Sequence, residues 1–421
     1  MNWLGKLFGK DERTGFARAV LKHLAETHPQ MKPTLNLEKF EIVLEGSGDG
    51  QGQTIFLDNF YSEYVAAPPK EKATAIAAFC SSVLFSDLNI PDTYEEASAI
   101  LVPRVMPKVE WFARNLEMQT MQTMQKTQEK SGDGANEADL SPTDVESPFL
   151  PLLDFYGCGL CLDLPQTLLF VNNGQLKKWG VSLDQAYKVA LTNLAKINPD
   201  VEFYSPTKGV YISQWSDTHD ASRVLLTDTI RKLSVVGSHV AMLPHRNVLI
   251  VTGSEDIAGL GAMLHIAEQQ ANVPRAMITQ PLHLVGDEWR DFAVPPSHPL
   301  FGELKKHRIL TWAACYEIQA HSLNRFFEGQ KRDVFVATLM VMEKAGKLMT
   351  ACTWSKGVEA YLPKAEFIAF TDGPKMVGMY TWDSVQKAVG DLMQPTDFFP
   401  TRYHVNSYPD AGQMQSFEKA M

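Results

Sequence analysis

The chain has 421 residues, a formal net charge of −10 and a hydrophobic content of 45%. This length exceeds one ordinary core, so we expect two or three domains of a globular protein. The sequence contains no block of basic residues, and we expect no nucleic-acid binding, which requires a basic patch. It also lacks the run of ~20 apolar residues that a membrane-spanning helix needs and the apolar core of a secretory signal, which predicts a cytoplasmic protein without a transmembrane segment.

The five cysteines are too few for a disulfide framework, and their odd number is typical of reduced thiols. Cys158 and Cys161 form a CxxC pair, but the residues around them favour a strand, which places the two thiols on opposite faces. A thioredoxin-type site would lie at the start of a helix, and a zinc site would need a second pair of ligands. We therefore expect buried structural cysteines, no metal site and no cofactor.

Residues 1–108 are expected to form an N-terminal α+β unit. The apolar spacing predicts, in order, a helix over 14–27, strands over 40–44 and 54–57, a helix from Pro68 to about residue 84, and a short strand over 101–105.

Two features of this unit allow a functional interpretation. Trp3 to Phe8 has helical apolar spacing, which fits either a membrane-surface helix or a terminal turn that packs on its own domain. The glycines at 46, 48, 50 and 52 have the wrong spacing for a dinucleotide-binding loop, and we expect a hairpin turn there.

Residues 109–147 are expected to connect the first two domains. Val109 to Lys130 is a long polar helix candidate in which Met118, Met121 and Met124 recur every three residues. Such a stripe can be a docking face for a protein partner, or simply a helix edge that faces the core or the solvent. Residues 131–147 have an acidic bias and no aromatic side chain, which predicts a flexible linker.

Residues 148–292 are expected to form an α+β domain, and their stretch 215–255 has the densest signal for ordered structure in the sequence. The pattern predicts a helix that Ser182 caps and that ends near residue 197, together with strands over 155–162, 167–171, 201–204 and 209–214.

The stretch 215–255 is predicted to form a helix, a strand, a turn and a second strand. Asp217 can act as the N-cap of this helix, with Asp220 completing an acidic variant of the capping box and Leu233 near the helix end. The turn Pro244–Asn247 then joins the apolar runs HVAML and VLIV, and a further helix is predicted over 255–270.

Residues 297–421 are expected to form a third domain. Its elements, in order, are a helix around 310–323, strands over 333–342, 349–354, 366–370 and 376–380, and a helix that Asp383 caps. The sequence therefore predicts an α+β protein with two similar helix-strand-strand-helix units, in residues 1–108 and 148–292, and a C-terminal antiparallel α+β domain.

The best polar group for a binding site is Asp220, Ser222, Arg223 and His245, to which Asp217, His219 and Arg246 lie close in the sequence. An aspartate beside a histidine can exchange protons, and an arginine can hold a carboxylate or phosphate. The same residues also fit structural roles, because the aspartates can cap a helix, Arg223 can pair with a carboxylate, and PHRN is a good turn. We assign no catalytic residue, since no serine-hydrolase, phosphate-loop, kinase or metalloprotease motif occurs.

The segment DASRVLL, followed after one strand by PHRNVLIV, resembles the YtpQ-like bacterial family, which is defined by a domain of unknown function. The upstream run LLFVNNGQLKKWGVSLDQAYKVALTNL is similar to that family as well. The resemblance is best over about residues 154–270 and looser over 16–104, whereas the part after about residue 295 lies outside it. The positions that match the family pattern are Asp220, Ala221, Ser222, Arg223, Pro244 and His245; His219 and Arg246 do not.

Two functions remain open from the sequence. One is a non-enzymatic cytoplasmic adaptor or ligand-binding module, with a protein partner on the helix Val109 to Lys130 or a small anionic ligand at the polar group. The other is an enzyme that acts on a small anionic substrate through Asp220, Arg223 and His245. The oligomeric state is left open.

Overall fold

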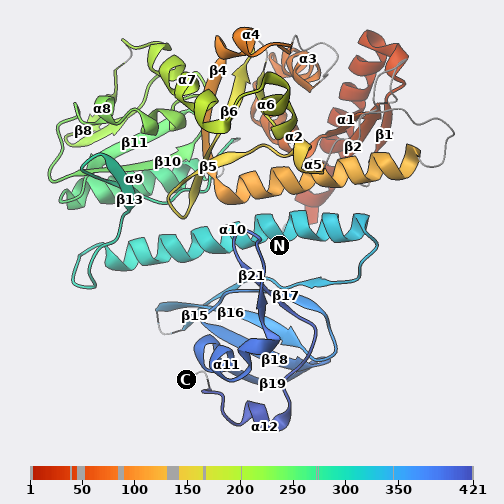
Figure 1. Ribbon diagram of the computed structural model, residues 1–421, viewed down its shortest axis with the longest axis vertical. Helices are drawn as coiled ribbons and strands as arrows, with labels where there is room; N and C mark the ends of the chain where they lie inside the picture. Colours follow the sequence, from red (N-terminus) through yellow and green to blue (C-terminus); the bar gives the residue numbers. More distant parts are fainter. Residues whose placement is uncertain are drawn as a thin grey trace. The chain divides into compact units, whose positions relative to one another are not determined.

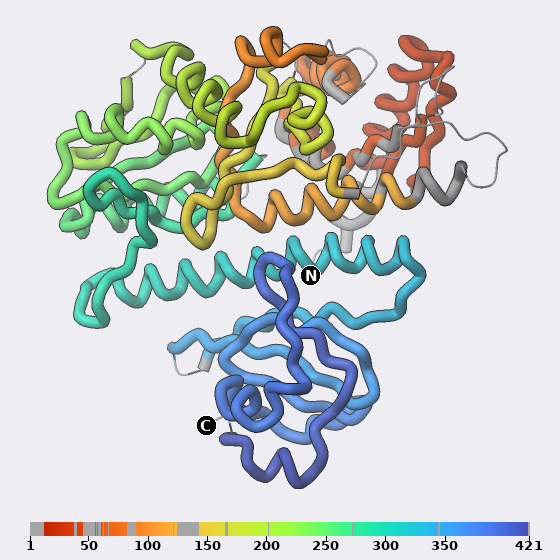
Figure 2. The backbone as a smooth tube through the Cα atoms, in the orientation of Figure 1, coloured from red at the N-terminus to blue at the C-terminus, as the bar shows by residue number. Residues whose placement is uncertain are grey.

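The structure is a computed structural model that describes residues 3–37, 40–44, 53–83, 90–129, 142–164, 167–200, 202–271, 273, 275–344 and 346–419 (Figures 1 and 2). The chain divides into two compact units. Unit 1 contains Met1–Asp92, Leu162–Leu169 and Asn272–Arg275, and unit 2 contains Thr93–Cys161, Phe170–Ala271 and Ala276–Met421. Helices and several small sheets occur together, which confirms the α+β class.

Unit 1 is a three-stranded antiparallel sheet with helices on it. Its elements are α1 (Trp3–Thr27), η1 (Pro29–Met31), β1 (Thr34–Asn36), β2 (Glu41–Leu44), β3 (Gln53–Phe56), α2 (Asp58–Ala66) and α3 (Lys72–Val83). Phe16 lies at the centre of the core and contacts the rings of Phe40, Phe60, Tyr61 and Tyr64. The helix α2 was not predicted, and the glycine-rich turn and the side chains of Trp3 to Phe8 lie outside the described residues.

The first sheet of unit 2 has the strand order β4-β6-β5 and includes β4 (Leu101–Pro107), β5 (Phe149–Leu152) and β6 (Tyr156–Asp163), with β7 (Leu168–Phe170) beside β6. Trp111, in α5 (Lys108–Glu129), lies flat against β6 and donates from Nε1 to the Gly157 carbonyl at 3.1 Å. A Cβ at Gly159 would come within 2.3 Å of the Trp111 ring, so the strand requires glycine at this close approach.

The second sheet of unit 2 has six strands in the order β13-β12-β10-β11-β9-β8. These are β8 (Tyr204–Thr207), β9 (Val210–Ile212), β10 (His239–His245), β11 (Val248–Gly253), β12 (Leu282–Val285) and β13 (Glu288–Asp291). The predicted hairpin of HVAML and VLIV is confirmed, although its loop contains only Arg246 and Asn247. The predicted helix capped by Ser182 is also confirmed as α7 (Leu183–Lys196), in which Ser182 and Gln185 form a capping box.

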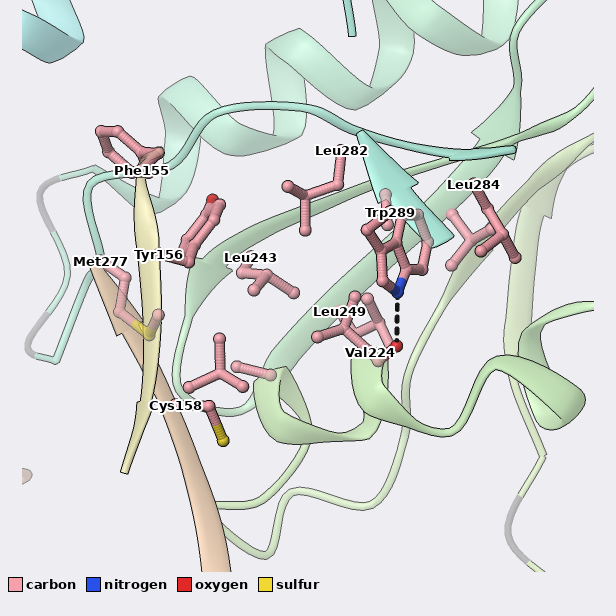
Figure 3. Packing of buried hydrophobic residues seen from close by; sticks show 14 of the residues in the cluster. Phe155, Tyr156, Cys158, Val224, Leu243, Leu249, Met277, Leu282, Leu284 and Trp289 are labelled. Carbon is pink, nitrogen blue, oxygen red and sulfur yellow. Dashed lines mark hydrogen bonds between the residues drawn. The ribbon is translucent and has the colours of Figure 1, made fainter. Parts of the chain in front are cut away.

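This sheet is buried on both faces. Successive residues of a strand point to opposite sides, and in β10 and β11 both sets of side chains lie in an apolar core. Leu243, Leu249 and Val251 face one core, in which Trp289 donates from Nε1 to the Val224 carbonyl at 3.0 Å (Figure 3). Val240 and Ile250 face the other core, beneath α9 (Ile257–Gln270). The two-sided burial explains why these strands read as continuous apolar runs.

The helix predicted from Asp217 to Leu233 is wrong. The segment forms a short 3-10 helix, η4 (Ala221–Leu225), and one turn of α-helix, α8 (Thr227–Ile230). Asp217 is not an N-cap, because its carboxylate binds the Arg223 guanidinium instead. Leu226, at φ −88° and ψ 67°, leaves the helical conformation between the two pieces.

The C-terminal part of unit 2 begins with the long helix α10 (Phe301–Gly329), which packs along α5 (Figure 1). Leu116 and Phe112 of α5 join Leu323 and Phe327 of α10 in one apolar cluster. The first half of the polar helix Val109 to Lys130 is therefore occupied by this chain itself. The side chains of Met121 and Met124 lie outside the described residues.

Two four-stranded sheets follow α10, with the orders β14-β17-β21-β20 and β15-β16-β18-β19. Their strands are β14 (Phe335–Val336), β15 (Met340–Lys344), β16 (Lys347–Ser355), β17 (Ala360–Pro363), β18 (Phe367–Asp372), β19 (Lys375–Thr381), β20 (Gln394–Pro395) and β21 (Arg402–Val405). The pairs β14·β17 and β16·β18 are parallel, so the sheets are mixed and not the uniform antiparallel meander that the sequence predicts.

The single strand predicted over 333–342 is also wrong, because it is divided into β14 and β15. Ala337, between them, donates its N–H to the Tyr361 carbonyl and accepts a hydrogen bond from Arg402 Nη1 at 2.6 Å. Arg402 is fully buried. It also donates to the carbonyls of Tyr361 and Tyr316 at 3.0 Å each and to Gln319 Oε1 at 2.6 Å.

Among the described residues, no helix combines the length and the apolar character needed to cross a bilayer.

The replacement Arg402→Met should strongly destabilise this part of the protein. It removes four hydrogen bonds from buried acceptors and leaves the Ala337 carbonyl and Gln319 Oε1 without a donor among the described residues, so we expect the free energy of unfolding to fall by about 3–5 kcal/mol. Urea denaturation followed by tryptophan fluorescence measures this change. Arg332→Met is the control, because its ion pair with Glu359 is solvent-exposed and should contribute less than ~1 kcal/mol.

Candidate functional site

Arg223 occupies a closed structural site. Its side chain is 2% exposed, and Nη1 and Nη2 donate to the two carboxylate oxygens of Asp217 at 2.7 and 2.6 Å. Nη2 also donates to the Ile197 carbonyl at 3.1 Å, and the Trp215 ring lies 4.4 Å from the guanidinium carbon. These contacts engage the guanidinium within the fold.

Ser222 and Asp220 are fully buried beside Arg223, but their side chains differ in hydrogen bonding. Ser222 Oγ accepts a hydrogen bond from the Val105 backbone N–H at 3.1 Å, which connects η4 to β4. Both carboxylate oxygens of Asp220 lack a hydrogen-bond partner within the described part of the chain. A buried carboxylate left in this way is costly, so Asp220 is the member of the predicted group that most needs a partner.

The β10–β11 turn lies directly against Asp220. The Ala221 N–H donates to the Arg246 carbonyl at 3.2 Å, which brings the Asp220 segment and the turn together. His245 is partly buried, and its Nδ1 accepts from the Asn247 N–H at 3.0 Å. The structure thus unites the two predicted pieces at their backbones, while the Arg223 guanidinium bonds to Asp217 and Ile197.

Three charged residues that the sequence reasoning did not assign to the site lie in the same region. Arg104, in the buried strand β4, donates from Nη1 to the Thr218 carbonyl at 2.7 Å, two residues before Asp220. Glu110 and Arg114 are in the first turns of α5, which follows β4 directly. We call Arg104, Glu110, Arg114, Asp220 and Arg246 the arginine–carboxylate cluster.

The electrostatics of Glu110 connect the members of this cluster. Burial raises the pKa of the Glu110 carboxyl above its usual value, and the positive charges of Arg246 and Arg104 oppose that effect only in part. Burial also lowers the pKa of Arg114, which lies close enough to Arg246 for the two like charges to repel. Perturbed carboxyl groups beside charged partners are a common feature of functional sites.

Several groups in the cluster lack partners. Within the described residues, the Glu110 carboxylate and the Arg246 guanidinium form no hydrogen bond or ion pair, although both side chains are partly buried. Arg114 Nε is buried without a hydrogen-bond partner, and the guanidinium lies over the Phe170 ring at 3.9 Å. Oδ1 of Asn247, in the adjoining turn, is likewise buried without a donor. Such a concentration of unpaired groups is typical of a surface that a ligand completes.

One sequence signal could have identified this cluster. Arg104 is a charged residue in the otherwise apolar run LVPRVMP, and Glu110 and Arg114 lie four residues apart on the helix face beside the buried Val109 and Trp111. A charged side chain in a buried strand needs a hydrogen-bonding or oppositely charged group near it, so it indicates a polar site. The polar residues at element ends are the more conspicuous signal in the sequence.

The cysteines lie in the interior. All five are buried and form no disulfide, and burial raises the pKa of Cys158 to about 12. Cys158 and Cys161 are in strand β6, as predicted. The part of the chain that the structure describes holds no group of three or more histidine, cysteine, aspartate or glutamate side chains that could bind a metal ion.

An open pocket lies away from the arginine–carboxylate cluster. It has a volume of about 540 Å³ and is lined mainly by α6 (Asn173–Trp179), the start of α7 and Thr143. None of the residues predicted for binding lines it.

Replacing Asp217 by Asn should destabilise the protein in a pH-dependent way. Partial burial tends to raise the pKa of Asp217, but the hydrogen bonds and the charge of Arg223 outweigh it and hold the pKa below its usual value. The stabilisation is therefore present above the unfolded-state pKa of about 3.9 and is lost as the pH falls through the lower folded-state value.

We expect the free energy of unfolding of Asp217→Asn to be about 2–4 kcal/mol below that of the wild type at about pH 6, with a smaller difference below about pH 4. Urea denaturation at several pH values measures the difference. Asp228→Asn, which removes an exposed carboxylate paired with Arg231, is the control and should have little effect. A constant difference down to low pH would contradict the ion-pair account.

Replacing Glu110 by Gln should have the opposite pH dependence. Because the folded state raises the pKa of Glu110, its contribution to stability is present below the unfolded pKa of about 4.3 and is lost as the pH rises through the folded-state value. Glu110→Gln cannot ionise, so we expect it to be more stable than the wild type at about pH 8 and equally stable at about pH 4. The control is Glu117→Gln, a more exposed glutamate of α5, and a destabilised Glu110→Gln at high pH would refute the assignment.

Comparisons with known proteins show a weak similarity to one group of proteins. No protein-family model matches this chain, and no solved structure matches it significantly. The chain is similar to UPF0354 proteins of Listeria innocua and Listeria welshimeri, each 28% identical over 107 residues. A UPF0354 protein of Listeria monocytogenes is 28% identical over 108 residues.

The aligned part is 25% of this chain and 40% of the Listeria innocua and Listeria welshimeri relatives, so the chain spans less than half the length of the curated relatives it matches. The names of these relatives state no activity, substrate or partner. The comparison therefore supports a resemblance to an uncharacterised protein family over a quarter of the chain.

Proposed function

We propose that unit 2 is a binding module for a small anionic ligand, which the arginine–carboxylate cluster holds. The observation that carries this proposal is a set of groups that form no hydrogen bond or ion pair within the described part of the chain: the Arg246 guanidinium, the Glu110 carboxylate and both oxygens of the buried Asp220. Leaving a buried polar group without a partner costs on the order of 1–3 kcal/mol, and more for a charged group such as the Asp220 carboxylate. A ligand that supplies their partners would recover this free energy on binding.

The charges of the cluster favour an anion. The cluster contains three arginines and two acidic residues, and the raised pKa of Glu110 reduces its negative charge further. Arginine binds carboxylates and phosphates through paired hydrogen bonds, which suits Arg246 in particular because its guanidinium forms no hydrogen bond or ion pair within the described residues. Asp220 accepts hydrogen bonds, so we propose a ligand that carries a hydroxyl or amino group beside its carboxylate or phosphate.

The alternative function is an enzyme that acts on a small anionic substrate. The proposal of Asp220, Arg223 and His245 as its centre has less support, because Asp217 and Ile197 already bind the Arg223 guanidinium. A different observation favours acid–base chemistry: the pKa of Glu110 is raised, and its carboxylate forms no hydrogen bond with the residues that the structure describes. If the ligand reacts, Glu110 is the group that we would expect to exchange a proton with it.

The wider biological setting is also a proposal. We infer that the protein is a bacterial, cytoplasmic member of the YtpQ-like group, an inference supported by the UPF0354 relatives in Listeria and by five cysteines that form no disulfide. A protein partner on the second half of α5 remains compatible with this function, because the α10 contact involves residues such as Leu116 in its first half. Binding of the partner would then depend on whether the anion is bound.

Thermal unfolding with added anions tests the binding site. We expect citrate or inorganic phosphate to raise the melting temperature of the full-length protein, since a ligand at 100 times its Kd stabilises by about 2.7 kcal/mol. Arg246→Gln should abolish this effect because it removes the unpaired cation.

Arg290→Gln is the matched control, since it removes an exposed arginine from the same unit. It should retain the full effect of the anions. Equal stabilisation of wild type and Arg246→Gln by every anion would contradict the proposed site.

A further inference from the structure

A second group of polar side chains meets at the opposite end of strand β10 from Arg246. Ser238 directly precedes β10, Ser254 directly follows β11, and His283 lies in β12. The sheet register fixes their proximity, because His239 pairs with Gly253 and Val240 pairs with His283. All three side chains are partly exposed, so solvent and small molecules can reach them.

The hydrogen bonds of this group have a definite direction. The Ser238 backbone N–H donates to Ser254 Oγ at 3.0 Å, so the Ser254 hydroxyl is available as a donor to Ser238 Oγ, 3.1 Å away. The Ser238 hydroxyl can then donate to His283 Nε2, at 2.5 Å. Burial, together with the positive charge of Arg290, lowers the pKa of His283, which favours the neutral ring that this arrangement requires.

The surrounding backbone holds the group in place. Gly237 has φ +80°, and a Cβ there would come within 2.6 Å of Ser254 Oγ, so the turn before Ser238 requires glycine. The Ser254 N–H donates to the Ser238 carbonyl at 2.7 Å. The ring of His283 packs edge-on against Phe292, with 5.6 Å between the ring centres. Ser238 and His283 are therefore preorganised at hydrogen-bonding distance, as nucleophile and base are in covalent catalysis.

We propose that Ser238 is a nucleophile, that His283 is its general base, and that the pair acts on esters of small carboxylic acids. Ser238 Oγ attacks the ester carbonyl and forms a new C–O bond, while its proton passes to His283 Nε2. The ester C–O bond then breaks, and the alcohol leaves with the proton from His283. Water releases the acid by the same steps in reverse order, so atoms and protons balance.

Apolar side chains beside the pair suit the acyl part of such an ester. Val236, 56% exposed, is two residues before Ser238, and Ile257, 46% exposed, is three residues after Ser254. The two segments are joined directly, because the Glu255 N–H donates to the Val236 carbonyl at 3.1 Å. The proposal shares no residue with the arginine–carboxylate cluster, so either can fail without the other.

Labelling with a fluorophosphonate probe tests this proposal on the full-length protein. The serine oxygen forms a P–O bond, the P–F bond breaks, fluoride leaves, and His283 accepts the proton. Intact mass spectrometry should show one adduct per chain, and peptide mapping should place it on Ser238. Ser238→Ala should remove the adduct, and His283→Gln should slow its formation by at least about 100-fold.

Ser205→Ala is the control, because Ser205 is an exposed serine in the same sheet that bonds only to the Thr207 carbonyl. It should label as the wild type does. Wild-type protein in urea should not label, which separates activation by the fold from ordinary serine reactivity even if His283→Gln fails to fold. An unlabelled native protein, an adduct at another residue, or equal rates for wild type and folded His283→Gln would overturn the proposal.

Discussion

Burying a guanidinium group removes it from water, and the protein must supply hydrogen bonds in exchange. Arg223 donates hydrogen bonds to Asp217 and Ile197, and the buried Arg402 donates to three carbonyls and to the Gln319 side chain. Both arginines thereby join segments that are distant in sequence and fix the path of the chain. They are structural because their hydrogen-bonding capacity is used within the fold.

Arg246 is the contrasting case. It lies in the two-residue turn between β10 and β11, and its carbonyl accepts a hydrogen bond from the Ala221 N–H, which joins the turn to η4. Its guanidinium nevertheless has no hydrogen bond or ion pair among the described residues, and neither has the nearby Glu110 carboxylate. A rigid scaffold that presents unpaired charges is the arrangement expected of a preformed binding site.

Much of the fold could be predicted from the sequence, because its local signals agree with the tertiary structure. The apolar runs of β10 and β11 are continuous since the sheet is covered on both faces, and Ser182 with Gln185 caps α7 as the sequence pattern indicates. The segment after Asp217 could not be predicted, because a contact with Arg223, six residues later, took the carboxylate away from the helix start. Likewise, the division of β14 from β15 depends on Arg402, 65 residues beyond Ala337.

The candidate site was predictable only in part, for a related reason. Asp220 and the turn at His245 lie in one conspicuous polar stretch, and the structure does bring these two segments together. Arg104 and Glu110 belong to a strand and a helix more than a hundred residues earlier, and only the tertiary bonds to Thr218 and Ser222 place them at the same point. Long-range pairing of this kind leaves no periodic signal in the sequence.

Native mass spectrometry of the gently purified, full-length protein, repeated after denaturation, tests the central claim most directly. The account predicts a discrete extra mass on the native protein, released on denaturation as a small acid and missing from Arg246→Gln prepared in the same way. A bare wild-type mass that also stays bare after incubation with carboxylate and phosphate metabolites would contradict it. The unpaired charges around Arg246 would then be satisfied by water alone.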